Sequence, residues 1–266
     1  MTTATATGER RSLSPAQGTG RAVVAELIKL RGTPSVWLLA ALALIAVLLG
    51  LVLTIVLGQI RTVDDVRSLL SFSGTGGFMV ILLGLVVAAG EYRYRTIVPT
   101  ALGEPGRARS FWGQILALGL VGLLLGLVAS ASATVITLAA LSVATDPPPV
   151  AALDVLAAVV GGTVYTTIAA MLGGAIGALA RNQVAGAIAM FVYLSMVDPL
   201  VGMAFPNYGQ FGPIALGIAL GGASPDPSGG PGALLLAPVV AGAVWFGYAA
   251  VLSLAAFAST LRRELP

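Results

Sequence analysis

The sequence predicts an all-α, polytopic membrane protein with six transmembrane helices. Of its 266 residues, 57% are apolar and only 9% are charged, whereas a soluble domain carries roughly 25% charged residues. The apolar residues are gathered into long blocks, several of which exceed the ~20 residues that a helix needs to cross a hydrocarbon core of ~30 Å. We therefore expect lipid to be the solvent for most of the chain.

Charged residues divide the chain into its spans. The predicted spans cover about residues 36–58, 71–90, 112–141, 155–180, 184–204 and 233–259. We expect residues 21–266 to form a single transmembrane domain. Residues 1–20 are rich in Thr, Ala, Ser and Gly without apolar periodicity, which predicts a disordered cytoplasmic tail.

Six spans place both termini on one side of the membrane, together with twelve of the fourteen Lys and Arg residues. The other side receives only Arg61 and Arg67, along with all six aspartates. Lys and Arg are concentrated in cytoplasmic connections of membrane proteins. Both termini are therefore predicted to be cytoplasmic.

The segment 21–31 (RAVVAELIKLR) is predicted to be an amphipathic helix ahead of the first span. Apolar and charged residues occupy different sides of that helix, namely Val23, Val24, Leu27 and Leu30 against Arg21, Glu26, Lys29 and Arg31. It is too charged to insert, so we expect it along the cytoplasmic interface. A juxtamembrane helix in solution, with no special role, is the alternative. Gly32 and Pro34 should end it.

The stretch between the fifth and sixth spans, Pro199 to Gly232, is rich in proline and glycine. Within it, Phe211 to Leu220 (FGPIALGIAL) is apolar but too short to cross a bilayer. Such a run is typical of a re-entrant or interfacial element. An ordinary extracellular loop packed on the bundle is the alternative.

Missing residue types exclude several kinds of chemistry. The chain has no Cys and no His, which excludes disulfides, thiolate and imidazole metal ligands, and histidine acid–base catalysis. A phosphate-binding P-loop needs a lysine directly after glycine, but the only lysine, Lys29, follows Ile28. The chain therefore cannot bind ATP through a P-loop, and any ATPase activity is expected on a partner subunit. We predict no catalytic, cofactor-binding or metal-binding residue and no nucleic-acid partner.

Polar and small residues inside the spans are further candidates. Asp198, before Pro199, is an ionisable group in an apolar stretch, and such groups usually face a cavity or a partner. It is a candidate translocation-path residue, unless it extends to the outer interface where Pro199 ends the helix. Two glycine pairs spaced by four, Gly122 with Gly126 and Gly173 with Gly177, indicate close helix packing or a subunit interface.

The densest charged cluster runs from Glu91 to Arg109 (EYRYRTIVPTALGEPGRAR), between the second and third spans. Tyr and Trp at headgroup level with cytoplasmic Arg would make an ordinary interfacial belt. A belt alone does not require the uncharged segment Thr96 to Gly103. We expect that segment to contact something other than lipid.

Two motifs resemble those of the permease subunits of ABC-2 type transporters. The first, E-x-x-K-L-R-x-T-P-x-x-W, consists here of Glu26, Lys29, Leu30, Arg31, Thr33, Pro34 and Trp37. The second, G-E-Y-R-x-x-T-I, covers Gly90 to Ile97 and is followed by R-x-R at Arg107 and Arg109. One departure is that a lysine often found at the start of the third span in that family is replaced, nearest by Gln114.

The resemblance implies a permease in the bacterial cell membrane, paired with a second identical or different permease and driven by cytoplasmic ATPase subunits that bind the ATP. It implies export of a hydrophobic or amphipathic compound. It also implies an ATPase-coupling segment, consisting of Glu91, Arg93, Thr96, Ile97, Val98, Pro99 and Thr100. The alternatives are an ion- or proton-coupled secondary transporter and an integral membrane enzyme.

Overall fold

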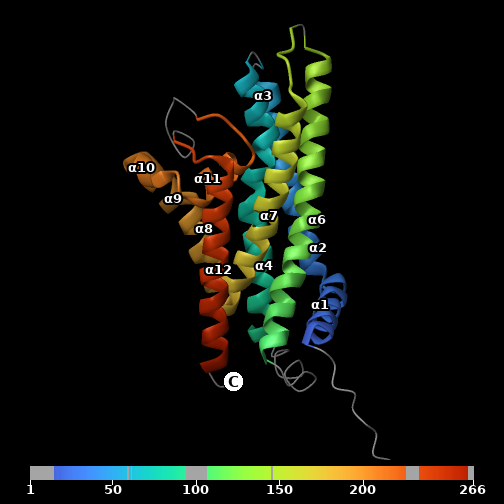
Figure 1. Cartoon of the computed structure of the whole chain (residues 1–266), viewed down its shortest axis with the longest axis vertical. Coiled ribbons are helices and arrows are strands. Elements are labelled where there is room, and N and C mark those ends of the chain that lie inside the picture. Colours follow the sequence, from blue (N-terminus) through green and yellow to red (C-terminus); the bar gives the residue numbers. More distant parts are fainter. Residues whose placement is uncertain are drawn as a thin grey trace, which may run out of the picture.

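The structure is a computed structural model that describes residues 15–58, 60, 62–93, 107–144, 146–225 and 234–262. Every regular element within these ranges is a helix. The long helices lie side by side along one axis and form an elongated bundle (Figure 1). The predicted all-α class is therefore confirmed.

Five helices in the described ranges are long and apolar enough to cross a bilayer: Pro34–Leu57, Ala108–Ser142, Ala152–Ala180, Gln183–Ala204 and Pro238–Thr260. The first is α2, the second is most of α6 (Arg107–Ser142), the third is α7, and the last is most of α12 (Pro238–Arg262). The fourth joins α8 (Gln183–Val192), the π-helical turn η2 (Tyr193–Val197) and α9 (Asp198–Ala204). The fold is that of a multi-pass helical membrane protein.

The segment predicted as the second span is built differently from the others. Ser71–Gly76 forms the 3-10 helix η1, and Gly77–Arg93 forms the apolar helix α4. Glycine and small hydroxyl residues in η1 are weak α-helix formers, which favours the tighter winding. At ~1.5 Å per α-helical residue and ~2 Å per 3-10 residue, η1 and α4 together extend over ~37 Å.

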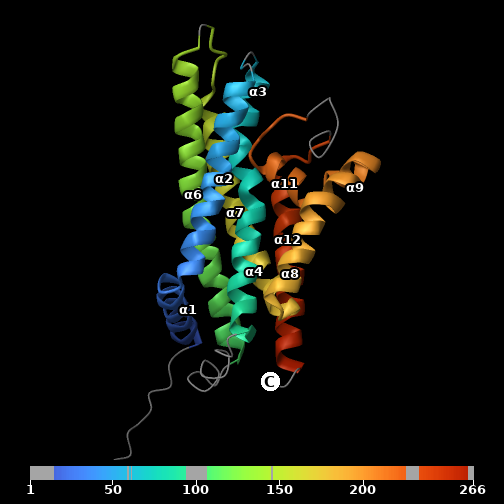
Figure 2. The same ribbon diagram turned by 180° about the vertical axis from the view of Figure 1, so that it is seen from behind.

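The long helices alternate in direction along the bundle (Figures 1 and 2). α1 (Pro15–Arg31) lies at one end, together with the start of α6 and the carboxyl ends of α4, α7 and α12. The short helix α3 (Val63–Leu70) and the connection from α6 to α7 lie at the other end.

Several helices begin at different residues from those predicted; α6, for example, begins at Arg107 rather than at residue 112. α1 begins at Pro15, inside the stretch predicted as a tail, and Arg109 of α6 packs over its Gly18, with the guanidinium 3.2 Å from the Cβ position there. α12 begins at Pro238 rather than at residue 233. A proline suits the first helical turn and disfavours helical geometry in the residue before it.

Glycines let α7 approach its neighbours backbone to backbone. A Cβ on Gly173 would collide with the carbonyl oxygen of Ile81 in α4, and a Cβ on Gly177 would lie 2.5 Å from that of Leu85. On α6, a Cβ on Gly122 would lie 2.8 Å from the carbonyl oxygen of Thr166 in α7. Both predicted glycine pairs therefore pack helices within the chain.

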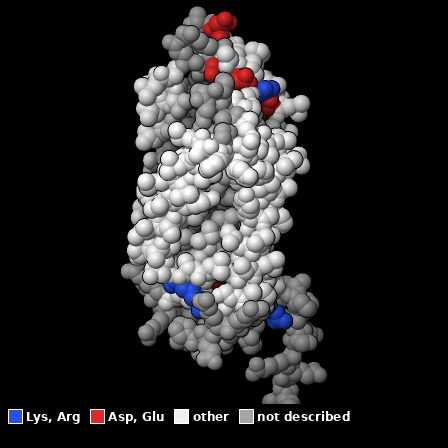
Figure 3. Space-filling view, turned by 90° about the vertical axis from the view of Figure 1, so that its left-hand side faces the viewer, with Lys and Arg blue, Asp and Glu red and all other residues white. Residues whose placement is uncertain are grey.

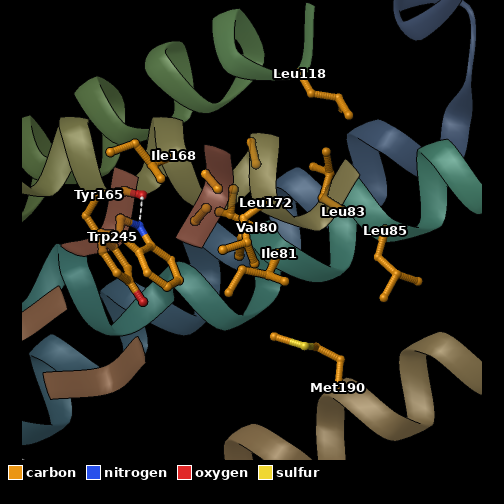
Figure 4. Packing of buried hydrophobic residues seen from close by; sticks show 14 of the residues in the cluster. Val80, Ile81, Leu83, Leu85, Leu118, Tyr165, Ile168, Leu172, Met190 and Trp245 are labelled. Carbon is orange, nitrogen blue, oxygen red and sulfur yellow. Dashed lines mark hydrogen bonds between the residues drawn. The ribbon is translucent and has the colours of Figure 1, made fainter. Parts of the chain in front are cut away.

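Aliphatic and aromatic side chains fill the space between α4, α7 and α12 (Figure 4). The Trp245 ring of α12 stacks on the Tyr165 ring of α7 with centroids 5.1 Å apart. The Trp245 indole N–H also donates a hydrogen bond of 3.1 Å to the backbone oxygen of Tyr165. This pair connects α7 to α12 inside the core.

Charged side chains separate to the two ends of the bundle. On the face shown in Figure 3, blue and red atoms lie only near the ends and a broad uncharged band separates them. The basic end carries Arg21, Lys29, Arg31, Arg109 and Arg181, and the acidic end carries Asp64, Asp65, Asp146 and Asp154. At the acidic end, Arg67 contacts Asp154 at 3.2 Å.

Candidate functional site

An ion network at the basic end connects α1 to the end of α4. Lys29 of α1 contacts the carboxylate of Glu26 one turn earlier at 3.3 Å, and it forms a second ion pair with Glu91 of α4. Glu26 is buried and only 11% of the Glu91 side chain is exposed, whereas 36% of the Lys29 side chain is exposed. One lysine therefore compensates two carboxylates that are largely withdrawn from water.

Burial of Glu26 differs from the sequence prediction, which places it on the charged side of an interfacial helix. Ala22, Glu26 and Leu30 face the bundle, while Val24 points outward and is exposed. Glu26 tolerates burial because Lys29 lies beside it, and a buried charge needs such a partner. In Figures 1 and 2, α1 stands along the side of α6 instead of lying across the bundle axis.

A second contact at the basic end involves the turn between α7 and α8. The Arg181 guanidinium lies 5.0 Å from the centroid of the Tyr92 ring, next to Glu91. Arg181 has a positive φ of 52° and ends α7, and Asn182 caps α8 by accepting hydrogen bonds from Val184 and Ala185. A cation over an aromatic face is attracted to it. The end of α4 therefore contacts α1 through Glu91 and the α7–α8 turn through Tyr92.

The remaining predicted coupling residues are only partly described. Arg93 is the last residue of α4. The others lie outside the described residues: Thr96, Ile97, Val98, Pro99 and Thr100.

Two further residues named from the sequence are Arg31 and Gln114. Arg31 ends α1 and is exposed, and its carbonyl oxygen accepts a hydrogen bond of 3.0 Å from the Trp37 indole. Gln114 is buried in α6, and its Nε2 has no hydrogen-bond partner in the described part of the chain.

Asp198 begins α9 and contacts the short helix α11 (Pro213–Leu220). α11 packs against η1, α7 and α12, and most of its side chains are buried. Asp198 is 6% exposed, and its carboxylate accepts a hydrogen bond of 3.4 Å from the Ile214 N–H in the first turn of α11. The Asp198 carboxylate is therefore buried against α11.

Two tyrosines also hold the start of α11. The Tyr165 hydroxyl of α7 donates a hydrogen bond of 3.0 Å to the Pro213 carbonyl. The Tyr248 hydroxyl of α12 donates one of 3.2 Å to the Phe211 carbonyl. α11 is thus fixed by polar side chains from three helices, α7, α9 and α12.

Sequence reasoning missed the roles of Arg181, Tyr165 and Tyr248. A signal existed for Arg181, because it is the only Lys or Arg between Arg109 and Arg262. The two tyrosines carry no comparable signal, since an aromatic residue inside a span is as typical of plain packing. Their partners are backbone carbonyls in a proline-rich connection that periodicity does not place.

The fold and the separated charges define the chain as a multi-pass helical membrane protein. Comparison with known protein families gives no match, and no curated protein matches the chain.

Proposed function

We propose that the chain is the permease subunit of an ABC-2 type transporter that exports a hydrophobic or amphipathic compound. In this proposal the bundle crosses the membrane six times, with η1 and α4 as the second crossing and α11 as an element that returns into the outer leaflet. The basic end faces the bacterial cytoplasm with both termini. Separate ATPase subunits bind ATP, and a second permease completes the transporter.

The contact between Lys29 and Glu91 carries this proposal. These residues are 62 positions apart and belong to the two motifs on which the resemblance depends. The contact connects α1 to the residues just before the proposed coupling segment. A partner that moves this end of α4 would therefore also move α1, which is the kind of linked motion that ATP-driven transport requires.

Charge separation supports the orientation, which cysteine labelling can test. The chain has no native cysteine. Gly20→Cys places a thiol at the basic end where a Cβ meets no neighbour within 4 Å, and Val143→Cys places an exposed one at the acidic end. In intact cells, we expect a membrane-impermeant maleimide to label the Val143→Cys variant fully, and the Gly20→Cys variant only after permeabilisation. Labelling of the Gly20→Cys variant in intact cells would contradict the orientation and the transporter proposal.

Purification of the tagged chain from its native membranes tests the function. We expect an ATPase with a P-loop to be recovered with it, and reconstituted transport to require ATP. Transport that proceeds without ATP and stops when the proton gradient is collapsed would instead support a secondary transporter. Chromatography of the purified chain shows whether a second permease accompanies it.

A further inference from the structure

The outward side of α1 carries a stripe of four exposed residues: Arg21, Val24, Ile28 and Arg31. Their spacing of three, four and three residues places them along one face, opposite the buried Ala22, Glu26 and Leu30. Ile28 is 68% exposed although it is a large aliphatic residue. We call these four residues the outer stripe; it extends over ~15 Å at 1.5 Å per residue.

The outer stripe is expected to lie at the level of the lipid headgroups. α6 has 36 residues and is ~54 Å long, whereas a bilayer is ~40–45 Å thick including its headgroups. α6 therefore extends beyond the hydrocarbon core, and its first turn, which carries the exposed Arg109, is expected to lie outside that core. α1 packs on the first turns of α6, where a Cβ on Gly113 would lie 2.7 Å from the Ala22 side chain.

Apolar surface continues from the outer stripe into the exposed side of α2. Trp37 follows Arg31 and is 58% exposed, and its indole N–H is fixed on the Arg31 carbonyl at 3.0 Å. The next exposed side chains on α2 are the aliphatic residues Leu38, Leu42 and Ile45. A lipid that covers this side of α2 with its acyl chains thus presents its headgroup to the outer stripe.

The charges of the outer stripe select among headgroups. Among the described residues, the ion pairs involve Lys29 and Arg67 and not Arg21, Arg31 or Arg109. Arg109 is also exposed and adds a third guanidinium. Its side chain lies over Gly18, about one turn before Arg21 in α1. Cations beside an apolar surface at a bilayer attract anionic lipids. A soluble protein partner would leave the apolar continuation into α2 unexplained.

We infer that the outer stripe of α1, with Arg109, binds the phosphate headgroups of anionic phospholipids in the leaflet at the basic end. Trp37 and the exposed aliphatic side of α2 contact the upper acyl chains, and Arg21, Arg31 and Arg109 contact the phosphates. Bound lipid would fix the outward side of α1, while Lys29 fixes its inward side on Glu91. The inference rests on the membrane orientation given under the proposed function.

Lipid retention by the full chain tests this inference. The chain is purified in a mild detergent and titrated with phosphatidylglycerol or with phosphatidylcholine of the same acyl chains, and bound lipids are counted by native mass spectrometry. We expect phosphatidylglycerol to be preferred, and the double variant R21Q/R31Q to weaken its binding about 30-fold, equivalent to about 1 kcal/mol for each cation. The loss should be reproduced by high salt in the wild-type chain.

Matched variants make the result specific. R67Q removes the same kind of charge at the acidic end and should retain phosphatidylglycerol, as should R21K/R31K, which keeps both charges. Equal retention by the wild type and R21Q/R31Q, or an equal loss in R67Q, would overturn the inference. The measurement needs neither ATPase nor substrate, so its failure alone leaves the proposed function standing. Labelling of the Gly20→Cys variant in intact cells would contradict both the lipid inference and the proposed function.

Discussion

Replacing Glu91 with lysine is expected to lower transport-coupled ATP hydrolysis about tenfold or more while the chain still inserts into the membrane. The substituted lysine would face Lys29, which now contacts both Glu91 and Glu26. Repulsion between two cations would separate α1 from the end of α4. A tenfold loss is within the ~1–3 kcal/mol that usually couples distant sites. ATPase activity of the reconstituted complex, with and without substrate, measures the effect.

The charge-swapped double variant K29E/E91K is the matched control. It restores opposite charges across the contact, because the new lysine on α4 lies beside two carboxylates on α1, so we expect it to recover much of the coupled activity. Glu91→Gln should lie between the wild type and E91K because it removes the attraction without adding repulsion. A well-inserted E91K protein with normal coupled hydrolysis would show that the contact has no part in coupling.

Replacing Gly173 with valine is expected to prevent stable folding of the bundle. Even the first added carbon would lie 2.9 Å from the carbonyl carbon of Ile81 and 3.0 Å from its Cα, besides colliding with the carbonyl oxygen. Overpacking a core typically costs ~1–3 kcal/mol when side chains can move. Here backbone meets backbone, so we expect a loss of about 3 kcal/mol or more, seen as aggregation during size-exclusion chromatography in detergent.

Gly247→Ala provides the control for that substitution. Gly247 lies in α12, where an added Cβ would meet nothing within 4 Å. Alanine favours the helix by up to ~1 kcal/mol relative to glycine, so the thermal unfolding temperature should stay the same or rise. If Gly173→Val unfolded at the wild-type temperature, α4 and α7 could not be in direct backbone contact.

Much of the fold is predictable from the sequence because burial in lipid imposes long apolar helices. The window from Arg109 to Asp146 predicts one long helix, and α6 occupies it. Boundaries set by tertiary contact are less predictable. α1 begins at Pro15, where a proline suits the first helical turn, and Arg109 of a distant helix packs over Gly18, a contact that no local pattern reveals.

The sequence indicates which residues belong to the candidate site, but it does not indicate which of them contact one another. Glu26, Lys29 and Glu91 all belong to motifs visible in the sequence, yet nothing in a linear pattern indicates that one lysine contacts both carboxylates. The amphipathic pattern of α1 assigns Glu26 to the polar side, whereas in the structure Glu26 is buried beside Lys29 of the same helix, which also contacts Glu91 of α4. Contacts between residues that lie far apart in the sequence depend on how the helices pack, and the periodicity of apolar residues does not specify that packing.

The stacked pair of Trp245 and Tyr165 gives the protein an intrinsic fluorescence reporter. The Trp245 indole is enclosed between α7 and α12, while Trp37 faces outward. Water entering between α7 and α12 would shift Trp245 emission to longer wavelength, whereas a change in surrounding lipid would alter the emission of Trp37 first. The third tryptophan, Trp112 of α6, packs on Phe111 and Phe257. In a Trp112→Phe variant, motion inside the bundle and events at its periphery thus have separate optical signatures.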